Sequence, residues 1–458
     1  MKHHSPATVV RRSLVLLALV LMPALKIDAQ RDPGPRAGAA GAGLPIPGLS
    51  AKEAEFFTAG LADFREAQSV RGPQPNQPDT EDTGGGLGPR FNSDSCGSCH
   101  SQPATGGTSP SPTSLQNPTE NPQASVGQKN GGTNLIPFFI HTGGPIREAR
   151  FKYQPDGSRD GGVHDLFVIT GRNDAAGCTI RQPDFTAAAA QNNLSFRIPT
   201  PVFGAGLIEA IPDSTILANK KADRLRKALR GISGRENRNG NDGTITRFGW
   251  KAQNKSLELF AAEAYNVEQG VTSEIFNTER DETPGCLFNG TPEDHTFFDA
   301  DDPQGAITDV MKFTHFMRFL APPTPAPDTP SIARGRLLFN AVGCALCHTP
   351  SLTTGVSSSA ALSNRPVQLF SDLLLHNMGR GLTDDIVQGA AGPEEFRTAP
   401  LWGLGQRIFL LHDGRTRDLL EAIEAHSSDH SEANAVIYEF KERSASAKQD
   451  ILNFLRAL

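Results

Sequence analysis

The sequence predicts a mainly α-helical fold with long loops and a few short strands, divided into two similar domains. Two observations carry this prediction. The string Cys-x-x-Cys-His occurs twice, at Cys96–His100 and at Cys344–His348, and each copy follows a Phe-Asn pair at the same distance. A proline-rich segment at 321–330 separates the two copies, and its prolines exclude a packed helix there. A repeated frame on both sides of a stiff connector is typical of a duplicated domain.

Each copy of the string is the attachment signal of a c-type haem. In such a site the two thiols add across the haem vinyl groups, and the adjacent histidine ligates the iron. Two copies in one chain make a chance match negligible, so we expect two covalently bound c-type haems in two cytochrome c-like haem domains. The haem-binding residues are Cys96, Cys99 and His100 for the first iron, and Cys344, Cys347 and His348 for the second.

Composition divides the rest of the chain. Basic residues come first, followed by an apolar run from Ser13 to Leu25 that is too short to cross a bilayer and by small residues ending at Ala29. This pattern predicts a secretory signal, with an uncleaved anchor as the alternative. The expected units are a signal peptide at 1–29, a flexible leader at 30–50, an N-terminal haem c domain with insertions at 51–320, a linker at 321–330 and a C-terminal haem c domain at 331–458.

Export fits the haem chemistry, because covalent c-type haem is added outside the cytoplasm. We expect a periplasmic or secreted protein of the bacterial envelope, without a stable membrane span. The formal net charge of −6 gives no reason to expect nucleic acid as a partner.

Cys178 and Cys286 remain once the haem sites are counted, and an oxidising compartment favours a disulfide between them over free buried thiols.

Local patterns predict loops and strands in the first half of the chain. Residues 101–134 are dominated by Ser, Pro, Thr, Gly and Asn, which predicts a long surface loop. Apolar, β-branched runs at 135–140 and 166–170 predict short strands.

Two helices are predicted from residue spacing. Residues 217–230 combine leucines with lysines and arginines, which predicts one amphipathic basic helix that is either solvated or a docking face for an acidic partner. Apolar residues in steps of three and four from Ala447 to Leu458 predict a terminal helix, with Ser444 or Ser446 as its N-cap.

Four further strings occur together, and they are Phe-Arg-Ile-Pro-Thr-Pro-Val-Phe-Gly-Ala-Gly-Leu-Ile-Glu-Ala-Ile-Pro at 196–212, Arg-Phe-Gly-Trp-Lys-Ala at 247–252, Phe-Arg-Thr-Ala-Pro-Leu-Trp-Gly-Leu-Gly from Phe396, and Leu-His-Asp-Gly at 411–414. With them the chain, from about residue 85 onward, resembles the di-haem oxidoreductase family of peroxidases, which is similar in turn to the bacterial di-haem cytochrome c peroxidases. The resemblance implies reduction of hydrogen peroxide, or of another small oxidant, by electrons that enter through one haem and react at the other. It also implies a periplasmic electron donor such as a small cytochrome or a cupredoxin.

The resemblance also points to the sixth ligand of the second iron. In related peroxidases that ligand follows the His-Asp-Gly string, and the matching offset here falls on His426, where many relatives have methionine. The residues agree, because Leu419, Ile423 and His426 lie on one face of a helix that Thr416 could cap. We therefore expect a bis-histidine iron of lowered potential.

Two rivals to His426 remain, since Met378 and the neighbouring His376 could ligate the same iron.

Related peroxidases often bind calcium through a threonine and a proline ahead of His-Asp-Gly, but Arg407 and Phe409 stand at those places here. Neither side chain offers calcium an oxygen, so we expect no calcium site of that kind.

Peroxide reduction at the first haem requires a group that moves a proton between the two peroxide oxygens. Glu209 is the candidate, because it is an ionisable residue inside an apolar run and burial would raise its pKa. The alternative is an ordinary surface or capping glutamate. His141 and His164 are candidates for the sixth ligand of the first iron, and the alternative is that each is an ordinary loop histidine. Trp250 could relay electrons between the haems or be a core residue.

The expected function is that of a secreted di-haem c-type oxidoreductase. Hydrogen peroxide would be reduced at the N-terminal haem, with electrons relayed through a bis-histidine C-terminal haem. Two alternatives stay open, namely a di-haem electron-transfer cytochrome without catalysis and a di-haem oxygenase resembling the rubber-cleaving enzymes.

Overall fold

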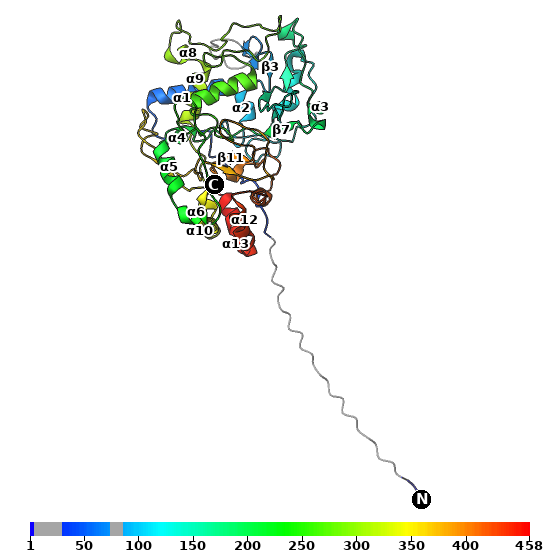
Figure 1. The fold of residues 1–458 in the computed structure, drawn as a ribbon, viewed down its shortest axis with the longest axis vertical. Coiled ribbons are helices and arrows are strands. Elements are labelled where there is room, and N and C mark those ends of the chain that lie inside the picture. Colours follow the sequence, from blue (N-terminus) through cyan, green and yellow to red (C-terminus); the bar gives the residue numbers. More distant parts are fainter. Residues whose placement is uncertain (4–29, 74–85) are drawn as a thin grey trace.

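The computed structural model describes residues 1–3, 30–73 and 86–458 (Figure 1). The predicted secretory signal therefore lies almost wholly outside the described residues. In the described part, helices contribute more residues than strands, as expected of a mainly α protein. No helix in that part is both long and apolar enough to cross a membrane.

The elements are mostly short. The α-helices are α1 (Ala51–Arg65), α2 (Cys96–Cys99), α3 (Phe185–Ala190), α4 (Ala205–Glu209), α5 (Asp213–Lys221), α6 (Arg224–Ala228), α7 (Leu257–Ala264), α8 (Pro303–Ala306), α9 (Asp309–Phe319), α10 (Pro330–Val342), α11 (Leu419–Glu424), α12 (Asn434–Lys441) and α13 (Ala445–Leu455). Short helical segments of other types are η1 (Pro122–Ala124), η2 (Val126–Gly131), η3 (Asn173–Ala175), η4 (Tyr265–Gln269), η5 (Cys344–Leu346) and η6 (Leu404–Gln406). The strands are β1 (Gln68–Ser69), β2 (Gly72–Pro73), β3 (Arg90–Phe91), β4 (Glu148–Phe151), β5 (Val163–His164), β6 (Phe167–Val168), β7 (Leu194–Arg197), β8 (Leu352–Thr353), β9 (Pro366–Val367), β10 (Leu375–Asn377) and β11 (Glu395–Arg397).

Helices α1 and α9 form the packed pair beside the first haem motif, in the upper part of Figure 1. A capping box starts α1, with Ser50 and Glu53 each bonding the other's backbone N–H. Gly60 allows the close approach of the two helices, because a Cβ atom there would come within 2.1 Å of the Lys312 carbonyl oxygen.

Helices α10 and α13 form the corresponding pair beside the second motif, in the lower part of Figure 1. Gly335 plays the same part as Gly60, since a Cβ atom there would come within 1.9 Å of the Asp450 carbonyl oxygen. Thr329 caps α10, which begins at the last proline of the proline-rich segment, and Ser444 caps α13, as the spacing predicted. Each haem motif thus lies beside a pair of helices in close backbone contact.

The first-half loop and strand predictions were only partly right. Residues 135–140 form no strand, whereas β6 lies within the predicted 166–170 run and pairs with β3. The largest sheet has the order β5-β4-β7, and all its pairs are antiparallel. Residues 101–134 are not a plain surface loop, because several of their polar side chains, including Gln102 and Gln123, are buried and hydrogen-bonded to backbone carbonyls.

The predicted basic helix at 217–230 is wrong as a single element. It is divided into α5 and α6 by Asp223, whose positive φ of 52° interrupts the helical backbone. Leu225 and Leu229 are exposed, so these leucines do not form a buried face.

The residues predicted as a flexible leader lie against the body of the protein. Asp32 forms a buried ion pair with Arg456 at 2.6 Å, and the Ile46 N–H donates to the Phe319 carbonyl at 2.7 Å.

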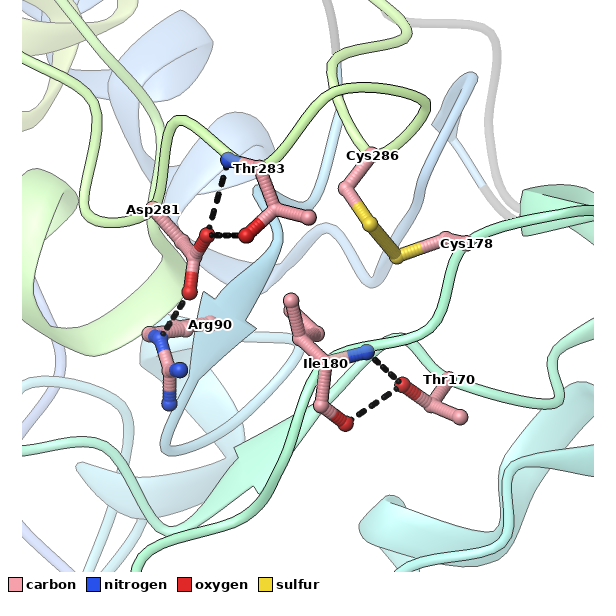
Figure 2. Close-up of a disulfide and its surroundings, with 7 residues drawn as sticks. All are labelled: Arg90, Thr170, Cys178, Ile180, Asp281, Thr283 and Cys286. Atoms are coloured by element: carbon pink, nitrogen blue, oxygen red, sulfur yellow. Dashed lines mark hydrogen bonds and ion pairs between the residues drawn. A yellow bond between two sulfur atoms is a disulfide. The ribbon is translucent and has the colours of Figure 1, made fainter.

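The disulfide prediction is confirmed, since Cys178 and Cys286 are bonded and both are buried (Figure 2). Figure 2 also shows the Arg90–Asp281 ion pair beside this link, with a nitrogen–oxygen distance of 2.7 Å. The disulfide joins the segment after β6 to the irregular segment between η4 and α8.

Candidate haem sites

The first haem motif opens onto a hollow of about 1150 Å³, a volume that includes the solvent at its mouth. Cys96 and Cys99 begin and end the single turn α2, and both side chains line the hollow together with His100. We call it the N-terminal cavity. Residues from α7, α9, β4 and β7 and the loop carrying Trp250 form the rest of its wall.

The His100 ring is held in the form that ligates iron. Its Nδ1 lies 3.0 Å from the Gly107 carbonyl oxygen, and because a carbonyl only accepts, Nδ1 must carry the proton. Burial lowers the pKa of His100 to about 4, so the ring is neutral and Nε2 keeps its lone pair. This arrangement fits a proximal haem ligand.

The two cysteines of this site fit covalent attachment. Neither is in a disulfide, and burial raises the pKa of each thiol to about 12, which keeps both in the neutral thiol form. The Gln269 side-chain amide donates to Cys96 Sγ at 3.2 Å.

Several acidic and amide side chains line the same cavity. Glu148 pairs with Arg150, and burial raises the pKa of Glu268 to about 8. Glu263, on α7, accepts a hydrogen bond from the Asn254 side-chain amide. Gln253 also lines this cavity, and its Oε1 atom is buried without a hydrogen-bond partner in the described structure.

Glu209 does not line the N-terminal cavity, so the prediction that it belongs to the peroxide site is corrected. It ends α4 and is absent from the cavity lining. Its carboxylate accepts from the Leu257 N–H at 2.9 Å, at the start of α7, and from Arg318 Nε at 2.8 Å. The apolar run around Glu209 is buried, but its own side chain reaches past the core to a helix end and an arginine. It is the capping glutamate that the sequence left as an alternative.

The two loose histidines are also away from the first iron site. His141 is exposed, and His164 bonds Asp160 at 2.9 Å while stacking on Phe151. Among the described residues that line the N-terminal cavity, His100 is the one histidine.

The second motif opens onto a hollow of about 1410 Å³, again with solvent included, which we call the C-terminal cavity. His348 follows the turn η5, and its Nδ1 lies 3.0 Å from the Phe370 carbonyl oxygen, so Nε2 is free as in His100. Burial, with the nearby His426 as the next cause, lowers the pKa of His348 to about 4. Cys344 and Cys347 are unpaired thiols that line this cavity.

His426 lies on the wall of the C-terminal cavity, as the sequence predicted. It comes just after α11 rather than on it, and the N-cap of α11 is Asp418 instead of Thr416. The His426 Nδ1 lies 2.7 Å from the Ala422 carbonyl oxygen, so this ring too presents an unprotonated Nε2. Two imidazoles in the ligating form therefore face one cavity.

The rivals differ from His426 in what holds them. His376 uses both ring nitrogens, one with Asp372 at 2.9 Å and one with Glu432 at 2.7 Å, so it has no nitrogen left for a metal. Met378 does line the cavity and remains the alternative ligand.

Trp250 lines both cavities. Its Nε1 donates to the Ile198 carbonyl at 2.9 Å, and its ring meets His412 edge-on at 6.3 Å between centroids. One indole therefore lies in the wall between the two haem sites.

Sequence reasoning missed Gln253 and Glu263. The signal was present, because Gln253 directly follows the Arg-Phe-Gly-Trp-Lys-Ala string and Glu263 interrupts the apolar run of α7. The criterion that selected Glu209, an acid among apolar residues, applies equally to Glu263.

Comparison with known proteins gives one family. A family model described as "Di-haem oxidoreductase, putative peroxidase" matches residues 147–458, which include the second haem motif but not the first. No curated protein matches the chain.

Three solved structures are similar at low identity. A MauG-like protein associated with microbial copper homeostasis is 19% identical with a TM-score of 0.30, over 57% of this chain and 90% of that one. The diheme peroxidase BthA of Burkholderia thailandensis is 16% identical with a TM-score of 0.28, over 46% and 65% of the two chains. The hydrazine synthase of Kuenenia stuttgartiensis is 15% identical with a TM-score of 0.27, over 62% and 97%. Because these TM-scores are low, the assignment of the chain to a family rests on the family-model match alone.

Proposed function

The chain belongs to the di-haem oxidoreductase family, and from this premise we propose that it reduces hydrogen peroxide at an N-terminal haem with electrons that arrive through a C-terminal one. One observation carries the proposal, namely the difference between the two cavities. The described lining of the N-terminal cavity offers one imidazole, whereas His348 and His426 both present a free Nε2 to the C-terminal cavity. The first iron would keep an exchangeable position for the oxidant, and the second would be closed and suited to electron transfer.

Peroxide reduction consumes two electrons and two protons and releases two molecules of water. Bound haem supplies the binding of the peroxide oxygen and the electrons. The protein must move a proton from the inner to the outer peroxide oxygen, so that water leaves.

We assign this proton transfer to Glu263. Glu148 is held by Arg150, and Glu268 lies close enough to the thiols to raise the pKa of Cys96 and of Cys99. Glu263 forms no ion pair within 4 Å in the described structure and accepts a hydrogen bond from the Asn254 amide, although the Arg150 guanidinium is near enough to interact with its charge. Gln253 lines the same cavity, and its side-chain amide would hydrogen-bond the peroxide and orient it for the transfer.

Trp250 supports the electron path in this proposal. Its indole lines both cavities and would shorten the path between the two haems. A small cytochrome or cupredoxin of the envelope would supply the electrons, and covalent attachment through both pairs of thiols would follow export.

Peroxide turnover in two matched variants tests the proposal. Glu263→Gln keeps shape but cannot accept the proton, so kcat should fall by a factor of about 100 to 10,000. Glu209→Gln is the control, because its carboxylate lies outside the cavity, and turnover should stay within about twofold.

The opposite pattern, with the large loss in Glu209→Gln, would return the catalytic role to Glu209. The parent protein should consume peroxide with a reduced donor, after partial reduction if required. If it does not, and if cyanide leaves its spectrum unchanged, both irons are closed and the protein is an electron carrier. Oxygen uptake with an alkene and no donor would instead indicate an oxygenase.

A further inference from the structure

Two arginines occupy the wall that the C-terminal cavity shares with a smaller hollow beside Trp250 and Trp402. Arg397 and Arg407 line both spaces. Both residues are buried, with exposed fractions of 9% and 8%.

Neither guanidinium group has a carboxylate partner among the described residues. Arg397 donates only to backbone carbonyls, through Nε to Gly249 at 3.1 Å and through Nη1 to Thr398 at 3.4 Å. The side chain of Arg407 makes no hydrogen bond or ion pair with any described residue, and the charge that affects it is the cation Arg456. Burial lowers the pKa of both guanidinium groups to about 10.

Other buried arginines of this protein are paired. Arg197 bonds Asp384 at 2.7 Å, and Arg456 bonds Asp32 at 2.6 Å. A buried charge without a counter-charge is costly, so two such cations on one wall need anions that the protein chain does not supply.

The backbone holds both arginines in place. Arg397 ends β11, and its N–H donates to the Trp250 carbonyl at 2.9 Å. Arg407 follows η6, and its own carbonyl accepts from Arg456 Nη1 at 2.9 Å. Backbone hydrogen bonds therefore fix the positions of Arg397 and Arg407 in the cavity wall.

We propose that Arg397 and Arg407 bind the propionate carboxylates of the C-terminal haem, an inference that rests on the two-haem part of the proposed function. A guanidinium group matches a carboxylate with two parallel hydrogen bonds. In haem the propionates lie on the edge opposite the vinyl groups, and the vinyl groups would bond to Cys344 and Cys347, which line the same cavity. The propionate edge would then face Trp250 and the N-terminal site.

The pairing of each guanidinium group with a propionate affects the redox potential of the haem. Each pair of guanidinium and propionate is neutral as a unit, so the propionate stays ionised and exchanges no proton when the iron changes oxidation state. Replacing one arginine by a neutral residue leaves a buried propionate without its cation, which stabilises the ferric iron and raises the pKa of the propionate.

The test is the midpoint potential of the C-terminal haem against pH in Arg397→Gln and Arg407→Gln. Arg334→Gln serves as the control, because Arg334 is an exposed arginine of the same half and pairs with Asp450. In alkaline solution each Gln variant should show at least a tenfold higher ferric-to-ferrous ratio at a fixed applied potential. That ratio corresponds to a downward shift of about 59 mV for one electron. The potential should also become pH-dependent near neutrality, while the parent and control stay flat.

A second readout separates propionate binding from a structural effect. Redox-difference infrared spectra should show altered propionate carboxylate bands in both Gln variants and unaltered bands in Arg334→Gln. Arg397→Lys and Arg407→Lys keep the charge, so their potentials should stay near that of the parent although the carboxylate bands shift.

Unchanged potentials and carboxylate bands in loaded Gln variants would overturn the inference. Loss of haem from all four variants, with the control loaded, would overturn it too, because the arginines would then serve folding. Peroxide turnover enters none of these measurements, so a parent protein without turnover would refute the proposed activity and leave the propionate assignment standing.

Discussion

Replacing His426 by alanine tests the proposal that His426 is the sixth ligand of the second iron. The change removes one imidazole from the C-terminal cavity and leaves Cys344, Cys347 and His348 in place. We expect both haems to stay attached and one of them to change from low spin to high spin or to a water-ligated state.

The structure sets the size of both effects. The spin change should affect one haem of the two, and His376 cannot take the place of His426 because Asp372 and Glu432 hold both of its ring nitrogens. The cost in stability should be modest. The variant loses the hydrogen bond of 2.7 Å to the Ala422 carbonyl, which is worth about 1 kcal/mol, and an unsatisfied carbonyl would bring the loss to at most about 3 kcal/mol. A folded variant is expected at that cost, since domains are stable by about 5 to 15 kcal/mol.

Ferric EPR with spin quantification is the assay, together with a count of covalently bound haem per chain. Met378→Ala is the matched control, because Met378 lines the same cavity and is the remaining rival ligand. An unchanged low-spin signal in His426→Ala, together with its loss in Met378→Ala, would refute the assignment of His426.

Two further predictions concern electron transfer and pH. Trp250→Phe should slow reoxidation of the C-terminal haem after peroxide is added, measured by stopped-flow absorbance. Trp402→Phe should not, because the Trp402 indole lines only the smaller hollow; equal rates in both variants would exclude Trp250 as the relay. Burial alone would raise the pKa of Glu432, but hydrogen bonds from His376 and Ser233 outweigh burial and lower the pKa to about 2. The stability that this carboxylate contributes is therefore present above its ordinary pKa of 4.5 and is lost as the pH falls from there toward 2. In urea unfolding across this range, Glu432→Gln should be less stable than the parent at pH 6 and converge with it in acid, whereas Glu439→Gln on the surface should track the parent throughout.

The candidate haem residues could be predicted from sequence because the residues that attach a haem are close neighbours in the chain. Two thiols and a histidine within five residues must lie together whatever the fold, and both strings do line cavities. His426 could be reached as well, since an offset from a recognised string along a short helix leaves little freedom. The terminal helix and its Ser444 cap depend in the same way on near neighbours in the chain.

Positions that depend on distant contacts could not be predicted in this way. Glu209 and Glu263 look alike as acids in apolar runs, and only the packing of α4 against α9 and the start of α7 turns Glu209 toward Arg318 while Glu263 faces the cavity. The pairing of Cys178 with Cys286 was reached by elimination, but the segments it joins lie more than a hundred residues apart and meet only in the folded chain. Local sequence therefore determined which groups can hold a haem, because covalent neighbours stay together. Only the tertiary structure decided which acids and arginines surround each site, because these come from segments far apart in the chain.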